Sequence, residues 1–432
     1  MTRLSFCTLC ALTAALSATA QEPATGIPLS PAHEAEAPRA VVDVLLTINL
    51  NYLNSIFKTA EQLQAETMEQ INTMLRNSEL AEQVEFRVVG TICYSNSDSK
   101  EYTARRIHEW RNAVQADLVL DLSNIDDFGL AGAAFTTGMP GELLRDGVRN
   151  HAEESFYAIV DVRASDQPSR YTGHTAAHEL SHLLGCGHCG TQLIQPWYGL
   201  YDFATGSIDP ARDSVTLMTY PEHAAHRPEE SGRYNSLLVL SAPRSFEHKG
   251  STHTIGHALE DNRRAFLMTA SMVAGYRNGS ATAVLHDTPQ RAFELPQLRN
   301  ISYYVERIGH NVDKNRQDAA YTLMAMQRTI PHLADGRAFC RVWGSTVNAT
   351  HDATPGSAPN VWYRLQLPLS GGYTAGFSAA TAPNSPMPPM QCRVYRREGE
   401  QLVPVACTPA AAERGVQSAS APAAKSRRQC SV

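Results

Sequence analysis

Residues 174–188 read HTAAHELSHLLGCGH, and this stretch decides how the rest of the chain is interpreted. Within it, His178 and His182 frame the pattern H-E-x-x-H. On a helix, residues four apart lie on one face, one turn from each other. Two imidazoles at this spacing can bind one metal ion, and Glu179, next to the first of them, can reach a water molecule on that metal.

Gly185 and His188 extend this pattern to H-E-x-x-H-x-x-G-x-x-H. Glycine allows the chain to leave the helix in a conformation that other residues resist, and His188 can then return to the same metal as a third ligand. Three protein ligands with one open position are typical of a catalytic zinc site rather than a structural one. We therefore predict a Zn2+ cofactor held by His178, His182 and His188.

This metal site has two competing interpretations. H-E-x-x-H alone also occurs by chance on amphipathic helices with surface histidines, but the extended pattern fixes five positions over eleven residues. His174 is also four residues before His178, so these two are an alternative pair. Thr175 follows His174 where a carboxylate is needed, and only the His178 register places Gly185 and His188 correctly. His174 is therefore interpreted as a residue near the start of the helix, close to the site.

The same stretch resembles the metzincin clan of zinc endopeptidases, whose second mark is a methionine turn beneath the zinc. Residues 216–220, TLMTY, fit that turn. The resemblance implies that Met218 forms the apolar floor of the site. It also implies that Tyr220 matches the tyrosine that reaches the zinc or the transition-state oxyanion in some metzincins. The similarity is to bacterial reprolysin-like members and covers roughly residues 40–280.

Apolar patterns upstream of the zinc helix predict alternating strands and helices. Strands are predicted over residues 41–48, 84–89, 117–122 and 156–162, and helices over 55–80 and 101–114. This alternation predicts an α/β fold with a mostly parallel sheet. The resemblance implies a metzincin-like catalytic domain with a twisted five-stranded sheet and the zinc helix. A further helix over residues 258–277 is predicted to close this domain.

Residues 129–135, GLAGAAF, are rich in small side chains. In metzincins the corresponding strand is the antiparallel edge that pairs with extended substrate, and such pairing supplies main-chain hydrogen bonds. The resemblance therefore implies that Gly132, Ala133 and Ala134 bind substrate. A plain buried strand, whose small residues suit close packing, is the alternative.

The C-terminal part of the chain has a different pattern. Residues 361–367 alternate apolar and polar side chains, and further short segments follow between Gly, Pro and Ser turns, which favours a small all-β, sandwich-like domain. The predicted organisation is a signal peptide, a flexible lead-in, a metzincin-like zinc protease domain, a helical connecting region, a β-sandwich-like C-terminal domain and a disordered tail, over residues 1–20, 21–38, 39–280, 281–338, 339–408 and 409–432 respectively.

The N-terminus predicts secretion. Arg3 precedes an apolar stretch over residues 4–16, and residues 18–20, ATA, form an A-x-A cleavage site. This run is too short to span a bilayer, and no later stretch approaches the ~18 unbroken apolar residues of a membrane span. We therefore expect a secreted or periplasmic bacterial protein. The net charge of -6, without a basic stripe, gives no sign of nucleic-acid binding.

The chain has nine cysteines, of which two lie in the predicted signal peptide. In an oxidising compartment some of the remaining seven should pair. Because seven is odd, at least one is free or intermolecular, and Cys430 in the tail is the first candidate. Cys186 and Cys189 flank the third histidine and offer thiolate ligands in principle. Since three histidines already supply the ligands, a disulfide that pins this loop is the favoured interpretation.

The predicted function is a monomeric zinc-dependent endopeptidase acting on protein or peptide substrates. Zinc would lower the pKa of its water towards neutrality, Glu179 would act as the general base, and Tyr220 would help to stabilise the oxyanion. The alternatives are a narrow-specificity protease acting on glycoprotein or cell-wall peptides and a non-catalytic zinc-stabilised adhesin. Glu179 disfavours the adhesin, since a structural site has no use for a general base.

Overall fold

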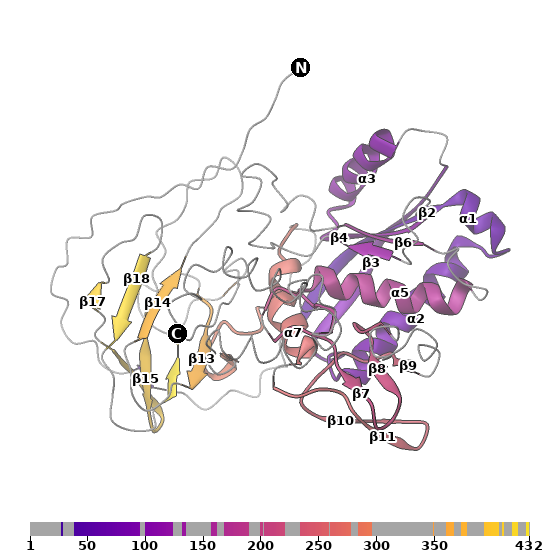
Figure 1. Cartoon of the computed structure of the whole chain (residues 1–432). Coiled ribbons are helices and arrows are strands. Elements are labelled where there is room, and N and C mark those ends of the chain that lie inside the picture. The colour runs from indigo at the N-terminus through magenta and orange to yellow at the C-terminus, as the bar shows by residue number, and fades with distance from the viewer. Residues whose placement is uncertain are drawn as a thin grey trace, which may run out of the picture. The chain divides into compact units, whose positions relative to one another are not determined.

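The computed structural model describes a mixed α/β protein (Figure 1). The chain divides into two compact units. One comprises Ala37–Leu285 and Arg299–Asn348, and the other comprises Met1–Glu36, His286–Leu298 and Ala349–Val432. The residues that the structure describes are 27–28, 39–95, 100–123, 132–134, 157–161, 168–189, 199–201, 203–220, 234–258, 260–277, 284–295, 349, 360–366, 373–377, 393–405, 408–409, 417–421 and 429–431.

The first unit is built on a sheet in the order β3-β2-β4-β6-β5. Its strands are β2 (Ala40–Asn49), β3 (Val84–Tyr94), β4 (Leu118–Ser123), β5 (Gly132–Ala134) and β6 (Tyr157–Asp161). β2 runs parallel to β3 and β4, and β4 runs parallel to β6. Only β5, at one edge of this sheet, is antiparallel to its neighbour.

The central strand β2 shows why this region forms a parallel sheet. Its residues Val42, Val44, Leu45, Leu46 and Ile48 are all fully buried. Because side chains along a strand alternate between faces, burial at both odd and even positions means that both faces of the sheet are covered. A continuous apolar run is typical of strands in parallel sheets with helices on each side.

Helices cover both faces of this sheet (Figure 1). α3 (Lys100–Val114) lies on one face, and α2 (Ala60–Asn77) and α5 (Pro168–Leu183) lie together on the other. α2 begins with a capping box, in which the Thr59 hydroxyl accepts from the Gln62 N–H and the Gln62 side chain accepts from the Thr59 N–H. Such a pair satisfies two backbone donors at a helix start. A short helix, α1 (Leu50–Ser55), follows β2 directly.

The remaining described elements of this unit follow α5 (Pro168–Leu183) in the chain. β7 (Ile208–Asp209), β8 (Ser214–Thr216) and β9 (Asn235–Leu237) form a small sheet that ends at the methionine turn. β10 (Ser245–His248) and β11 (Ser251–Thr254) form a hairpin. α7 (Asn262–Val273) closes the unit, and its Phe266 ring meets Phe86 of β3 edge to face.

The second unit contains two sheets. One has the order β1-β16-β15-β19-β13-β12, formed by Ile27–Pro28, Gln401–Pro404, Tyr395–Glu398, Gln429–Ser431, Tyr363–Gln366 and Phe293–Glu294. The other has the order β14-β18-β17, formed by Tyr373–Phe377, Gln417–Ala421 and Thr408–Pro409. A small core of Ala292, Trp362, Tyr395 and Leu402 lies on the first sheet.

The predicted α/β class is confirmed by these elements, and several predicted boundaries change. The helix predicted over residues 55–80 is divided into α1 and α2. Strands β18 and β19 lie within residues 409–432, the predicted disordered tail, and each is paired on both sides in its sheet. Most of the predicted helical connecting region lies outside the described residues, and its described part, 284–295, carries a 3-10 turn and β12.

Among the described helices, none combines the length and the apolar character that crossing a membrane requires.

A buried histidine should make the stability of the second unit depend on pH. His286 is 1% exposed, its Nε2 lies 3.3 Å from the Tyr363 hydroxyl, and its ring stacks on Phe293. Burial lowers the pKa of His286 from 6.5 to about 4. Between these values the unfolded state binds a proton that the folded state does not, so stability is lost as the pH falls. We expect this group to lower the free energy of unfolding by about 2 kcal/mol between pH 7 and pH 5.

Urea unfolding followed by tryptophan fluorescence measures this effect. His286→Gln keeps a polar partner for Tyr363 but cannot titrate, so its stability should fall less between the two pH values. An equal loss of unfolding free energy in the wild type and in His286→Gln would show that groups other than His286 cause the pH dependence.

Candidate metal centre

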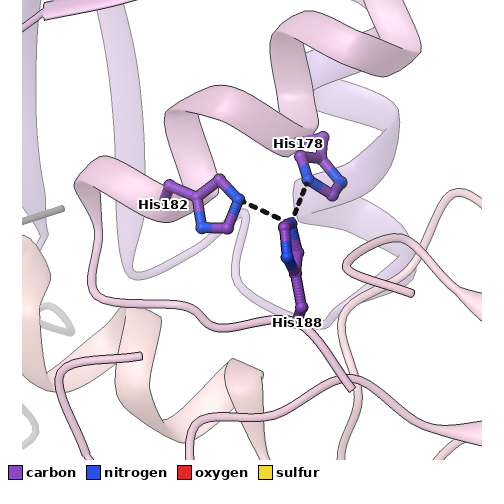
Figure 2. A group of neighbouring side chains, drawn as sticks. All are labelled: His178, His182 and His188. Carbon is purple, nitrogen blue, oxygen red and sulfur yellow. Dashed lines mark hydrogen bonds between the residues drawn. The ribbon is translucent and has the colours of Figure 1, made fainter. Parts of the chain in front are cut away.

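The three predicted ligands lie together at the end of α5 (Figure 2). His178 and His182 project from one face of this helix, and His188 returns from the loop that follows it. The Nε2 atom of His188 lies 3.0 Å from Nε2 of His178 and 2.9 Å from Nε2 of His182. Candidate ligand atoms of the three residues all lie within 4.8 Å of one another, and no other described group of His, Cys, Asp and Glu forms such a cluster.

Hydrogen bonds on the far side of two rings fix the direction of their lone pairs. His178 Nδ1 lies 2.8 Å from the carbonyl oxygen of Leu217, and His182 Nδ1 lies 2.9 Å from that of Cys186. A carbonyl oxygen only accepts, so each Nδ1 carries the proton and each Nε2 presents a lone pair. The Nε2 lone pairs of His178 and His182 therefore point at Nε2 of His188. Imidazoles oriented in this way by backbone carbonyls are typical metal ligands, so the donor set fits Zn2+.

The electrostatics of the site also favour neutral ligands. Burial lowers the pKa of His178 to about 4. It lowers the pKa of His182 to about 3, with a smaller contribution from neighbouring His178. Both imidazoles are therefore neutral near pH 7. A metal ion requires the unprotonated form, so protons compete weakly for this site at neutral pH.

The helix ends where the motif predicts, at Gly185. Gly185 has φ +83°, its N–H donates to His182 O, and the N–H of Cys186 donates to Ser181 O. This pair of bonds is a Schellman motif, in which the left-handed position is most often glycine. A Cβ at Gly185 would lie 2.8 Å from Thr269 Oγ1, so space as well as conformation requires glycine. The chain then reverses and brings His188 back over the helix.

Glu179 lies beside the first ligand and is 3% exposed. In the absence of a positive charge, burial raises the pKa of its carboxyl to about 8. A divalent cation within a few ångströms would favour the ionised carboxylate and lower this pKa again.

The predicted methionine turn contacts the histidines. Met218 is fully buried, and the preceding residue, Leu217, supplies the carbonyl that orients His178. The ring of Tyr220 stacks on that of His178 at a centroid distance of 5.5 Å and lies 4.7 Å from that of His188. Tyr220, which is distant in sequence from the H-E-x-x-H motif, thus meets it in space, and Met218 directly follows the residue that contacts His178.

The other residues of the sequence analysis lie outside the histidine cluster. Gly132, Ala133 and Ala134 form β5, the antiparallel edge strand of the main sheet. His174 is not part of the histidine cluster, since its Nε2 lies 3.1 Å from the hydroxyl of Ser236 in β9.

The disulfide expected around the third ligand is wrong for Cys186. Its side chain is a buried thiol that lies 3.4 Å from the carbonyl oxygen of Asn262. Cys189 is also buried and is not joined to Cys186. Hydrogen bonds to α7 hold this loop instead of a covalent link. Cys340, Cys392 and Cys407, three of the seven cysteines among which some pairing is expected, lie outside the described residues.

Asn262 is the main residue near this site that sequence reasoning did not single out. It is fully buried and contacts Gly187, which is 75 residues earlier in the chain. No local pattern marks such a contact. The only signal in the sequence is the polar start of a helix, DNRR, next to an otherwise apolar run.

Comparisons with known proteins agree with the motif. Residues 62–189 match a family model described as Metallo-peptidase family M12B Reprolysin-like. This match confirms the resemblance to reprolysin-like metzincins and suggests zinc-dependent proteolysis. A search of curated proteins found no match.

Two solved structures are similar to parts of the chain at 17% identity. One, described as the structure of a chaperone-substrate complex, has a TM-score of 0.40 and covers 56% of this chain and 35% of its own. The other, metalloproteinase-II from Bacteroides fragilis, has a TM-score of 0.24 and covers 40% of this chain and 51% of its own. The chain therefore spans about a third and about half of the length of these two proteins.

Proposed function

We propose that this chain, in which residues 62–189 match a reprolysin-like metallopeptidase model, is a secreted zinc-dependent endopeptidase that hydrolyses peptide bonds in proteins. The convergence of three imidazole Nε2 atoms, two of them oriented by backbone carbonyls, carries this proposal. Such a set leaves room for water and substrate at the metal. A buried carboxylate next to the first ligand favours hydrolysis over a purely structural role.

The residues of the site have complementary roles in this proposal. His178, His182 and His188 would hold Zn2+, which when bound supplies a Lewis acid and lowers the pKa of water towards neutrality. Glu179 accepts a proton from the attacking water and later delivers it to the leaving amine. No nucleophilic side chain is required.

Tyr220 is proposed to stabilise the oxyanion. Its ring is held against His178 and His188, so its phenol belongs to the same site. A hydrogen bond from the phenol to the developing oxyanion would lower the barrier without contributing to the binding of the metal. Met218 forms the buried floor.

Substrate binding is proposed to use the edge strand β5. An edge strand presents backbone N–H and C=O groups that an extended peptide can pair with. Gly132, Ala133 and Ala134 form this strand, and it pairs on one side with β6. We propose that the peptide adds to its other side.

The finer organisation is part of the same proposal. Residues 39–280 would form the metzincin-like domain, with its twisted, mostly parallel five-stranded sheet, and residues 339–408 a β-sandwich-like domain. The apolar N-terminus would direct secretion or periplasmic export, and the enzyme would act as a monomer.

Replacement of Tyr220 by Phe tests the proposed oxyanion contact. The variant keeps the ring that packs on the histidines and removes only the hydroxyl. Loss of one oxyanion donor typically costs about 10²- to 10³-fold in kcat, so we expect a fall of at least 10-fold with KM and zinc content nearly unchanged. Steady-state kinetics on a fluorogenic peptide and metal analysis measure these quantities. A fall confined to zinc content would instead assign Tyr220 to metal binding.

A peptide-library digest with and without chelator tests the function as a whole. Chelator-sensitive cleavage at many sites supports a general endopeptidase. A single narrow consensus supports a specialist on glycoprotein or cell-wall peptides. No chelator-sensitive cleavage would exclude the protease and favour a zinc-stabilised binding protein.

A further inference from the structure

We infer that Asn262, the first residue of α7, is a positioning residue for the third metal ligand, because its side chain fixes the loop formed by residues 186–188. This inference rests on the proposed function, since it concerns the geometry of the same metal site. Asn262 itself does not belong to the cluster of ligand atoms.

The amide of Asn262 binds both polar groups of Gly187. Its Oδ1 accepts from the Gly187 N–H at 3.0 Å, and its Nδ2 donates to the Gly187 carbonyl at 2.9 Å. The backbone carbonyl of Asn262 accepts from the Cys186 thiol at 3.4 Å. Two opposed bonds to one residue fix the orientation of a peptide segment as well as its position, and Gly187 directly precedes His188 in the chain.

The position of Asn262 is itself fixed by hydrogen bonds. Its N–H donates to the Ser241 hydroxyl at 3.0 Å, and that hydroxyl donates to the Thr205 carbonyl at 2.6 Å. The preceding residue, Asp261, caps α7 by accepting from the Arg264 N–H. A capped helix start is well defined, so it offers a fixed reference for the loop.

The opposite side of the loop is also filled. The carbonyl of His188 accepts from the Gly206 N–H at 3.2 Å. A Cβ placed on Gly187 would lie 2.4 Å from the Ala204 carbonyl oxygen and 2.6 Å from the Gly199 nitrogen. The loop is therefore held between the start of α7 and residues 199–201 and 203–206. Within these limits the His188 ring faces His178 and His182 (Figure 2).

This support matters more for His188 than for the other two ligands. His178 and His182 are placed by the backbone of α5, whereas His188 lies in a loop whose position depends on its contacts. The Asn262 amide supplies a donor and an acceptor side by side, as the two groups of Gly187 require. Aspartate would place a carboxylate oxygen against the Gly187 carbonyl oxygen, and two acceptors repel each other. Alanine would leave the buried N–H and C=O of Gly187 without these two hydrogen bonds.

The test measures zinc affinity of the full chain by competition with a chromophoric chelator. Loss of a residue that orients a ligand typically weakens metal affinity by about 10- to 100-fold. We expect that loss in Asn262→Ala and a comparable loss in Asn262→Asp. The visible spectrum of bound Co2+ should also change, because one ligand is no longer held in place.

Asn112→Ala is the matched control. Asn112 lies on α3, and its amide oxygen accepts from the Arg277 guanidinium, 165 residues away. It therefore also links distant segments, but outside the metal site. We expect Asn112→Ala to lose stability while keeping wild-type zinc affinity and the wild-type Co2+ spectrum. Circular dichroism identifies the variants that fold, and Asn262→Asp, which keeps the shape of the side chain, decides the result if Asn262→Ala does not fold.

The outcomes separate this inference from the proposed function. Unchanged zinc affinity and an unchanged Co2+ spectrum in a folded Asn262 variant would overturn the positioning role, while zinc binding by the wild type would leave the proposed function standing. Failure of the wild type to bind one zinc ion would overturn the proposed function and with it this inference. Weaker binding in the Asn262 variants alone supports the positioning role.

Discussion

Glu179→Gln is expected to bind zinc like the wild type and to lose nearly all peptidase activity. A positioned general base typically contributes about 10²- to 10⁴-fold to the rate, and an amide cannot accept the proton of the attacking water. The change keeps the size of the side chain. Since the carboxyl is 3% exposed, a neutral amide should be tolerated at least as well as a buried carboxylate. Activity should therefore fall without a loss of stability.

The measurement combines turnover of an unfolded protein substrate with zinc stoichiometry and thermal unfolding. Glu66→Gln is a suitable control, because Glu66 is a partly exposed residue of α2 that pairs with Lys58. That variant should behave like the wild type in all three assays. Undiminished turnover in Glu179→Gln would contradict the proposed mechanism. A loss of bound zinc would show instead that Glu179 contributes to metal binding.

The parts of the site that could be predicted from sequence are those set by local geometry. The helix spacing of His178 and His182 and the left-handed turn at Gly185 follow from backbone geometry alone, so eleven residues suffice to predict that the three histidines meet. The strands and helices before the motif were also predictable, because burial on both faces of a parallel sheet leaves continuous apolar runs such as that in β2.

Features that depend on distant segments could not be predicted in this way. The loop that carries His188 is held by Asn262, far along the chain, rather than by the disulfide that two nearby cysteines suggested. Sequence spacing shows that cysteines are close but not whether their sulfurs meet, since disulfides need a specific geometry. The contacts of the Tyr220 ring with His178 and His188 likewise depend on how the turn around Met218 folds against α5.

Backbone carbonyls connect these distant parts to the metal site. The turn around Met218 supplies the Leu217 carbonyl to His178, and the helix end supplies the Cys186 carbonyl to His182. Both bonds set the tautomer that presents Nε2 to the metal. The methionine turn and the Schellman turn therefore orient ligands in addition to shaping the backbone, and a mutation that moves either turn should weaken metal binding.

His182→Ala should abolish both zinc binding and activity, whereas His174→Ala should preserve both. The two histidines lie on the same helix and differ in what they face. His182 is buried with its Nε2 2.9 Å from that of His188, while His174 contacts Ser236. Removal of a ligand should weaken zinc affinity by more than the ~100-fold upper range for residues that only orient ligands. Activity should fall to the level of the chelated wild type.

The comparison of His182→Ala with His174→Ala also distinguishes the two pairs of histidine ligands that the sequence allows. Zinc stoichiometry and turnover are measured for both variants and for His178→Ala, which removes a ligand shared by the two pairs. Loss of zinc in His174→Ala with retention in His182→Ala would mean that the metal is bound by the other register, in which Glu179 no longer follows the first ligand. His174 and His182 are each four residues from His178, so sequence spacing alone does not distinguish them. The expectation that His174→Ala keeps zinc rests on the contact of His174 with Ser236 in the fold.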